Sequence, residues 1–300
     1  MPRAASNLVL VLLLFTLQVV AQDQGPHAWE HLIDSGKYDD AKTLCTSWQA
    51  SKELAYKVEA EKCLANVELS RKDAQVVHLE GNDTGGGMMY GGYTDEATDA
   101  AIAHLDVALQ LAPKDESVWK GKLYLLEAAE RFEKMAETLE AACSELKYAK
   151  VDDWIAYPGE LLSNDEAHAG ILLLDVLDRH FPNSNEVLGD YAAAYGMLKQ
   201  FNKAIAYAQR AVALAPNDPI DVWNLGRMYD GAGQTAEADK WLQKALAMQS
   251  DAERRCYYAH FIEGKVHDRK RACQMEKADC EQNDRSACVN SASKAAPAAK

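Results

Sequence analysis

The stretch DVWNLGRMYDGAGQTAEADKWLQKALAM, which runs from Asp221 to Met248, decides the fold of this chain. It places small and large apolar residues at helical spacing. The small ones are Gly226, Ala238 and Ala245, and the large ones are Val222, Leu225, Tyr229 and Leu242. Small side chains let two helices approach closely, and large ones fill the space that remains. The stretch therefore predicts two short helices packed against each other.

The same spacing returns upstream, often with a proline at the end of the set. The matching positions are Leu188, Tyr195, Phe201, Ala204, Ala211 and Pro216; Trp154, Leu174 and Pro182; Trp119, Phe132, Leu139 and Ala142; and Ala101, Leu105, Ala108 and Pro113. Successive sets are offset by 34, 34, 35 and 34 residues. Five matches in register at this period indicate a repeat architecture, in which proline ends one helix pair and fixes the turn into the next.

This pattern resembles the tetratricopeptide repeat, a helix-turn-helix unit of 34 residues. The resemblance covers residues 22–252 and implies an all-α fold, a superhelical solenoid of antiparallel helix pairs with about six repeats. A solenoid needs an atypical polar end to stop it from stacking further. Residues 253–290 are therefore expected to form cysteine-rich capping helices, and residues 291–300 a disordered tail.

Two features depart from the repeat pattern. Pro158 stands where a small residue is expected, so it is predicted to break or shorten its helix. An insertion at residues 73–94, with the run GGGMMYGGY, separates helices expected near Glu53–Ser70 and Asp95–Leu111. Glycine, methionine and tyrosine together favour a mobile, adaptable contact surface. A disordered insertion without function is the alternative.

Residues 1–21 have the features of a secretory signal peptide. Arg3 gives a short positive region, Leu8–Leu17 is an apolar run too short to span a bilayer comfortably, and Val19–Ala21 supplies small residues for cleavage. The protein is therefore expected to be secreted or periplasmic, and an uncleaved N-terminal anchor is the alternative. No later segment is apolar enough for stable membrane insertion.

The charge of the chain bears on its partners. Its 32 Lys and Arg residues stand against 46 Asp and Glu residues, a net charge of -14. Nucleic-acid binding needs concentrated Lys and Arg to meet the phosphates. The acidic balance argues against such a partner.

The seven cysteines are expected to form three disulfides and leave one thiol. Cys45 and Cys63 are symmetric about an expected helix turn at Leu54, and Cys256 and Cys273 are symmetric about Gly264–Lys265. The spacing of Cys280 and Cys288 resembles the disulfides of secreted cysteine-rich helical-repeat proteins, which leaves Cys143 free. Two alternatives are that all the thiols are reduced, or that Cys256, His260, His267 and Cys273 bind zinc, although their spacing is not that of a common zinc finger.

One catalytic motif occurs near the start of the expected repeats. His27-Ala28-Trp29-Glu30-His31 matches H-x-x-E-H, the pattern of inverted zinc metallopeptidases. On a helix, His27 and His31 lie one turn apart, and Glu30 would be the general base. That family needs a large domain and a further glutamate, whereas repeats occupy the rest of this chain. Zinc metallopeptidase is therefore an alternative function, and no catalytic residue, metal or cofactor is assigned.

In the family that the chain resembles, the first helix of each repeat lines a concave groove. Mapped onto this chain, the partner-binding residues of the groove are Lys120, Tyr124, Glu127, Asp152, Ile155, Met197, Trp223, Arg227 and Asp230. Because Val222 fills the neighbouring core position, the Trp223 ring need not lie in the core, and Trp, Tyr and Arg often carry binding energy. A Trp223 ring that packs on the neighbouring repeat is the alternative. The expected function is a non-catalytic scaffold or assembly factor of the cell envelope or secretome. Its partner would be a protein or peptide held in the groove. Self-association as an envelope structural protein is the other alternative.

Overall fold

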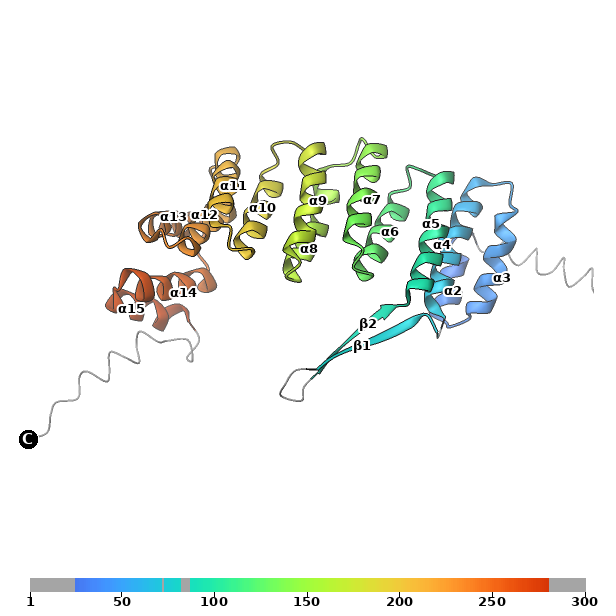
Figure 1. The fold of residues 1–300 in the computed structure, drawn as a ribbon, viewed down its shortest axis with the longest axis horizontal. Helices are drawn as coiled ribbons and strands as arrows, with labels where there is room; N and C mark the ends of the chain where they lie inside the picture. Colours follow the sequence, from blue (N-terminus) through green and yellow to red (C-terminus); the bar gives the residue numbers. More distant parts are fainter. Residues whose placement is uncertain (1–24, 72, 82–86, 281–300) are drawn as a thin grey trace, which may run out of the picture. The chain divides into compact units, whose positions relative to one another are not determined.

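The computed structural model describes residues 25–71, 73–81 and 87–280 of the 300-residue chain. The chain divides into two compact units, Met1–Tyr148 and Ala149–Lys300. Each unit is built mainly from helices that follow one another in antiparallel pairs (Figure 1). The predicted signal peptide at 1–21, the predicted disordered tail at 291–300 and Cys288 lie outside the described residues.

The first unit contains three helix pairs. Its helices are α2 (Ala28–Asp34), α3 (Tyr38–Gln49), α4 (Leu54–Ser70), α5 (Asp95–Leu111), α6 (Glu116–Ala128) and α7 (Phe132–Glu145). Trp29, Trp48 and Leu64 are buried around the Cys45–Cys63 disulfide, which joins α3 to α4. Part of the hydrophobic core of this unit therefore surrounds a covalent link.

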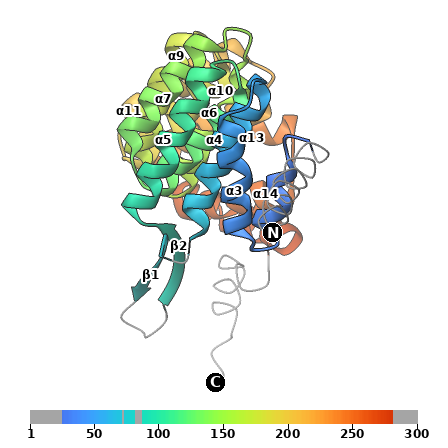
Figure 2. The same ribbon diagram turned by 90° about the vertical axis from the view of Figure 1, so that its right-hand side faces the viewer.

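The insertion between α4 and α5 contains a β-hairpin. Strands β1 (Gln75–Gly81) and β2 (Gly87–Tyr93) pair antiparallel, with Gln75 opposite Tyr93. Figures 1 and 2 both show this hairpin extending away from the ends of α4 and α5. At its base the Thr94 amide donates to the Ala74 carbonyl at 2.7 Å, and the Thr94 side chain caps α5. The regular structure was not expected from the glycine content, but valine and tyrosine are strong strand formers.

The second unit continues the pairs and ends in a cap. Its elements are the 3₁₀ turn η1 (Val151–Asp153), α8 (Ala156–Ser163), α9 (Ala167–His180), α10 (Asn185–Met197), α11 (Phe201–Leu214), α12 (Pro219–Gly231), α13 (Thr235–Met248), α14 (Ala252–Phe261), the π-helical turn η2 (Ile262–Val266) and α15 (Arg269–Asp279). Helix α8 is short, as Pro158 predicted. The proline lies in its first turn, where a missing amide is tolerated.

The turns between paired helices share one backbone geometry. A residue with positive φ follows the first helix at Gly36, Glu130, Asp165, Lys199 and Gly233. In each turn the next amide donates to the carbonyl five residues earlier, at 2.8 or 2.9 Å. This is the Schellman motif, which satisfies the last carbonyls of a helix. The backbone geometry therefore repeats from turn to turn, even though three of these five residues are not glycine.

Small residues bring the paired helices together, as the sequence predicted. A Cβ added to Gly226 on α12 would lie 2.8 Å from Leu242 Cδ2 and 3.0 Å from the Leu242 amide nitrogen on α13. A Cβ on Gly170 of α9 would lie 2.9 Å from Leu162 Cδ2 of α8. Separations this short leave no space for a side chain. The predicted all-α solenoid of tetratricopeptide type is confirmed, with one two-stranded hairpin added.

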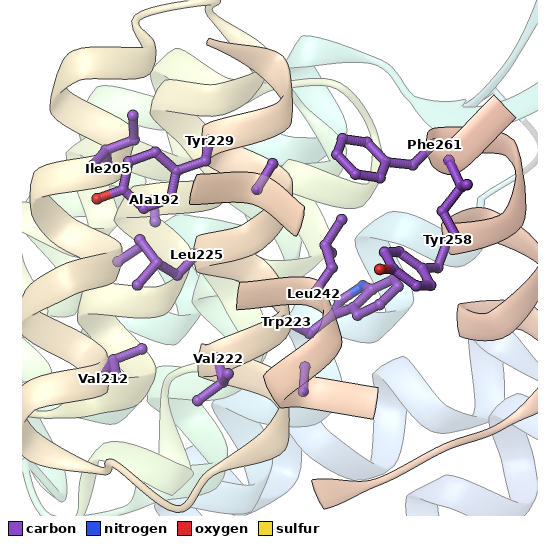
Figure 3. Packing of buried hydrophobic residues seen from close by; sticks show 14 of the residues in the cluster. Ala192, Ile205, Val212, Val222, Trp223, Leu225, Tyr229, Leu242, Tyr258 and Phe261 are labelled. Atoms are coloured by element: carbon purple, nitrogen blue, oxygen red, sulfur yellow. The ribbon is translucent and has the colours of Figure 1, made fainter. Parts of the chain in front are cut away.

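The C-terminal cap packs on the last helix pair through large side chains. Tyr258 and Phe261 of α14 are buried with Trp223 of α12 and Leu242 of α13, as Figure 3 shows. The Tyr258 hydroxyl donates to Asp239 on α13. The cap therefore extends the core of the second unit beyond the last repeat.

The disulfides agree with the sequence analysis in part. The Cys45–Cys63 bond and the free Cys143 are confirmed. The Cys256–Cys273 and Cys280–Cys288 pairings are wrong, because Cys256 bonds to Cys280 and Cys273 takes part in a different disulfide. The cap hairpin turns at the end of η2, where His267 has a φ of 62°, rather than at Gly264. This later turn places Cys256 opposite Cys280.

Among the described residues, each helix is too short or too polar to cross a bilayer.

Candidate functional site

Three predicted groove residues lie on one face of α6 in the first unit. Lys120, Tyr124 and Glu127 follow one another at helical spacing. The Tyr124 side chain is 62% exposed, an unusual value for a large ring. Lys120 Nζ lies 2.6 Å from a Glu116 carboxylate oxygen, one turn earlier. The face therefore offers an open aromatic ring with charged neighbours of both signs.

Three further predicted residues lie on separate elements of the second unit. Asp152 is exposed in η1, and Ile155 is half-buried at the N-cap of α8. Met197 ends α10 and is 37% exposed. Each of the three belongs to the first helix of its pair or to the turn that leads into it.

The last three predicted residues are brought together by a residue that the sequence analysis missed. The ring of Tyr257, on α14, lies edge-on to Trp223 with the centroids 5.3 Å apart. The Arg227 guanidinium lies 5.8 Å from the centroid of the same ring. The Tyr257 hydroxyl donates to Asp230 Oδ2 at 2.8 Å. One tyrosine of the cap therefore contacts all three predicted groove residues of α12.

This arrangement corrects the expectation for Trp223. We expected its ring to line an open groove, with packing against a neighbour as the alternative, and the side chain is only 8% exposed. Besides Tyr257, the Arg254 guanidinium lies 5.8 Å from the centroid of the Trp223 ring. The physical reason is that the cap follows the last repeat directly and buries the apolar surface that α12 would otherwise present to water.

Asp230 makes two polar contacts between α12 and the cap. Lys265 Nζ lies 3.7 Å from Asp230 Oδ1, on the other side of the carboxylate from Tyr257. Burial raises the pKa of Tyr257 to about 12, and its hydrogen bond to Asp230 adds to the rise. The phenol therefore remains a donor at neutral pH. No sequence motif marks Tyr257 or Lys265, because their importance depends on how the cap folds back.

A pair of carboxylates lies between α10 and α12. The Asp221 side chain is buried and accepts a hydrogen bond from Asn185 Nδ2 at 3.1 Å. Burial, together with the nearby carboxylates of Asp221 and Glu186, raises the pKa of Asp190 to about 6. Burial likewise raises the pKa of Asp221. The Asn185–Asp221 hydrogen bond links α10 to α12, and neither carboxylate was predicted from the sequence.

A cavity of about 680 Å³ lies on α5, α6 and α7 of the first unit. Its lining includes Trp119 and Thr138, and the Lys122–Asp106 ion pair, at 2.6 Å, joins α6 to α5 beside it. On α6, Trp119 and Lys122 occupy the side away from Tyr124. The hollow is therefore distinct from the face that carries Lys120, Tyr124 and Glu127.

The H-x-x-E-H residues lie at the start of the first pair. His27 precedes α2 as its N-cap, and its Nδ1 lies 3.3 Å from Glu30 and 3.5 Å from Glu59. His31 is exposed in the last turn of this seven-residue helix. His27 therefore stands at the start of the first turn of a helix of only seven residues. Glu59 also accepts from Trp29 Nε1 at 3.0 Å, which gives the cluster a packing role.

The stacked pairs, the recurrent Schellman turns and the small residues at helix crossings together define a tetratricopeptide-repeat solenoid. Residues 186–218 and 222–251 match the family model of the tetratricopeptide repeat. These two segments cover α10–α11 and α12–α13. No curated protein sequence matched the chain.

Several solved structures are similar to this chain. PilW, described as a widely conserved type IV pilus biogenesis factor, is 19% identical, with 65% of this chain and 91% of PilW covered and a TM-score of 0.45. PilF of Pseudomonas aeruginosa is 14% identical, with coverages of 65% and 90% and a TM-score of 0.43. A tetratricopeptide repeat protein of Parabacteroides merdae is 12% identical, with coverages of 84% and 90% and a TM-score of 0.41.

Proposed function

We propose that this protein is a non-catalytic scaffold or assembly factor of the cell envelope or secretome. It binds a partner polypeptide on the first helices of its repeats. The observation that carries the proposal is Tyr124, a ring that is 62% exposed on α6 between Lys120 and Glu127. An aromatic ring flanked by both charges can anchor a peptide and set its orientation.

The chemistry of the cysteines supports a compartment outside the cytosol. Two disulfides join described residues, Cys45–Cys63 and Cys256–Cys280, and such bonds persist in oxidising surroundings. The signal-peptide features of residues 1–21 agree with this location. An acidic chain with a net charge of -14 favours a protein partner over nucleic acid.

The test is a crosslinking capture from the native envelope and secretome with matched tyrosine variants. Tyr124→Ala removes the proposed anchor, and Tyr148→Ala removes a ring of the same unit that is 64% exposed and lies outside α6. We expect Tyr124→Ala to reduce recovery of the specific partners at least tenfold, because one buried aromatic anchor contributes about 2 kcal/mol. Tyr148→Ala should recover them as the wild type does. Equal recovery by both variants would refute binding on this face.

A further inference from the structure

Four potential metal ligands face one another across the cap hairpin. Cys256 and His260 lie one turn apart on α14, and Glu276 and Cys280 lie one turn apart at the end of α15. The ligand atoms of Cys256, His260 and Cys280 all lie within 4.8 Å of one another. Glu276 Oε1 lies 3.8 Å from His260 Nε2, and the Glu276 side chain is fully buried.

The spacing of these residues follows from the antiparallel hairpin. The Cys256–Cys280 bond links the start of α14 to the end of α15, and one turn further in His260 meets Glu276. Residues four apart on a helix share a face. The two helices therefore make two neighbouring contacts on one face of the hairpin. One contact supplies two sulfurs, and the other supplies one imidazole nitrogen and one carboxylate oxygen.

We propose that the cap binds one zinc ion through Cys256, His260, Glu276 and Cys280 when the Cys256–Cys280 disulfide is reduced. Zinc takes four ligands of these types, with Zn–S distances of about 2.3 Å and tetrahedral geometry. That geometry separates two sulfur ligands by about 3.8 Å, which is also the separation that two thiols adopt once they are no longer bonded. Breaking the disulfide therefore moves the sulfurs toward the positions that zinc requires.

The chemistry balances with one added reductant. A dithiol gives two electrons and two protons to the Cys256–Cys280 bond, so that two thiols form and the dithiol becomes a disulfide. Zinc then replaces the two thiol protons, which are released to water. The disulfide and the zinc site use the same two sulfurs, so each excludes the other.

This site would keep the cap closed in both redox states. The disulfide or the metal holds α14 against α15, and α14 in turn packs Tyr258 and Phe261 on the last repeat. The ligand set differs from the zinc alternative weighed on the sequence, because Cys273 is disulfide-bonded elsewhere and His267 is exposed beyond η2.

The experiment measures zinc on the full-length protein after reduction. A phosphine reductant and zinc are added together, excess metal is removed by desalting, and the bound zinc is quantified by mass spectrometry. The background carries Cys273→Ser and Cys288→Ser, which removes the other two cysteines of the C-terminal region. We expect one zinc per chain when the protein is reduced and none when it is oxidised. Cobalt in place of zinc should give a thiolate-to-metal charge-transfer band.

Matched variants separate this site from other thiols. In the same background, Cys256→Ser with Cys280→Ser should lose the zinc, whereas Cys45→Ser with Cys63→Ser should keep it. Glu276→Gln and His260→Ala should each weaken zinc binding at least tenfold, while circular dichroism checks that the helices persist. Equal zinc retention by the Cys256→Ser, Cys280→Ser variant, or no zinc on the folded reduced protein, would overturn the proposal. Because this readout needs no partner polypeptide, it is independent of the proposed function.

Discussion

The Asp190 carboxylate lowers the free energy of unfolding at neutral pH, and a single substitution can remove this effect. Burial and the carboxylates of Asp221 and Glu186 raise its pKa from 3.8 to about 6. A raised carboxyl pKa means that the folded state holds a proton that the unfolded chain has released. The contribution of Asp190 to stability is therefore present below pH 3.8 and lost as the pH rises through 6.

Asp190→Asn should stabilise the protein at neutral pH only. We expect the free energy of unfolding to rise by about 2 kcal/mol at pH 7 and to be nearly unchanged at pH 4, since one pKa unit corresponds to about 1.4 kcal/mol. Urea unfolding at the two pH values measures the difference. Asp152→Asn, at an exposed position of the same unit, is the control for removing one carboxylate. A gain of the same size at pH 4 and pH 7 would contradict the assignment to Asp190.

At the scale of the helix pair, two glycines should respond in opposite directions. Gly226→Ala places a methyl group 2.8 Å from Leu242 Cδ2 and 3.0 Å from the Leu242 backbone, so it should destabilise the protein by about 2 kcal/mol. Gly121→Ala, within α6, meets nothing within 4 Å and should stabilise by about 0.5–1 kcal/mol. Thermal unfolding of the two variants provides the comparison. A neutral Gly226→Ala would show that α12 and α13 can move apart at little cost.

The helix pairs could be predicted because the contacts that form them join residues that are close together in the sequence. Gly226, Ala238 and Ala245 mark contacts between helices that are neighbours in the sequence, and Pro158 marks a break that is also local. The hairpin at 75–93 was missed because its glycines suggested disorder, whereas strand pairing depends on both halves of the insertion.

The cap was harder to predict than the repeats because its contacts depend on one turn. Symmetry about Gly264 paired Cys256 with Cys273, but the hairpin turns at His267 and pairs Cys256 with Cys280. The same fold-back buries Trp223 under Tyr257. A residue that is exposed in an isolated repeat is therefore covered here by a segment that does not follow the repeat pattern.

At the scale of the whole molecule, the thiol count tests the covalent framework. Cys143 is the free cysteine among the described residues, and burial raises its pKa to about 12, with a further contribution from Glu140. Because the thiolate is the nucleophile, the native protein should resist alkylation. Without reductant, we expect no label in the folded protein and one label, on Cys143, after denaturation. Labelling at Cys45, Cys63, Cys256 or Cys280 would contradict the framework.

The two disulfides between described residues stabilise different units. Cys45–Cys63 joins residues 18 apart in the first unit, and Cys256–Cys280 joins residues 24 apart in the second. Each closed loop of this size contributes about 3 kcal/mol on the chain-entropy model. In a repeat array each pair is stabilised mainly by its neighbours, so covalent links have the greatest effect on pairs near the ends.

Tyr257 occupies the surface of α12 that a ligand would otherwise contact, because its ring and hydroxyl engage Trp223, Arg227 and Asp230 together. A ligand that binds those three residues must displace Tyr257, which belongs to the same chain and is therefore present in every molecule. Only molecules with the cap displaced can accept it, and its apparent Kd is the intrinsic Kd divided by that fraction. If the cap contact amounts to about 3 kcal/mol, roughly one molecule in a hundred is open and the affinity falls by about two orders of magnitude. A ligand at the last repeat therefore binds more weakly than its own contacts would allow, whereas Tyr124 on α6 is 62% exposed.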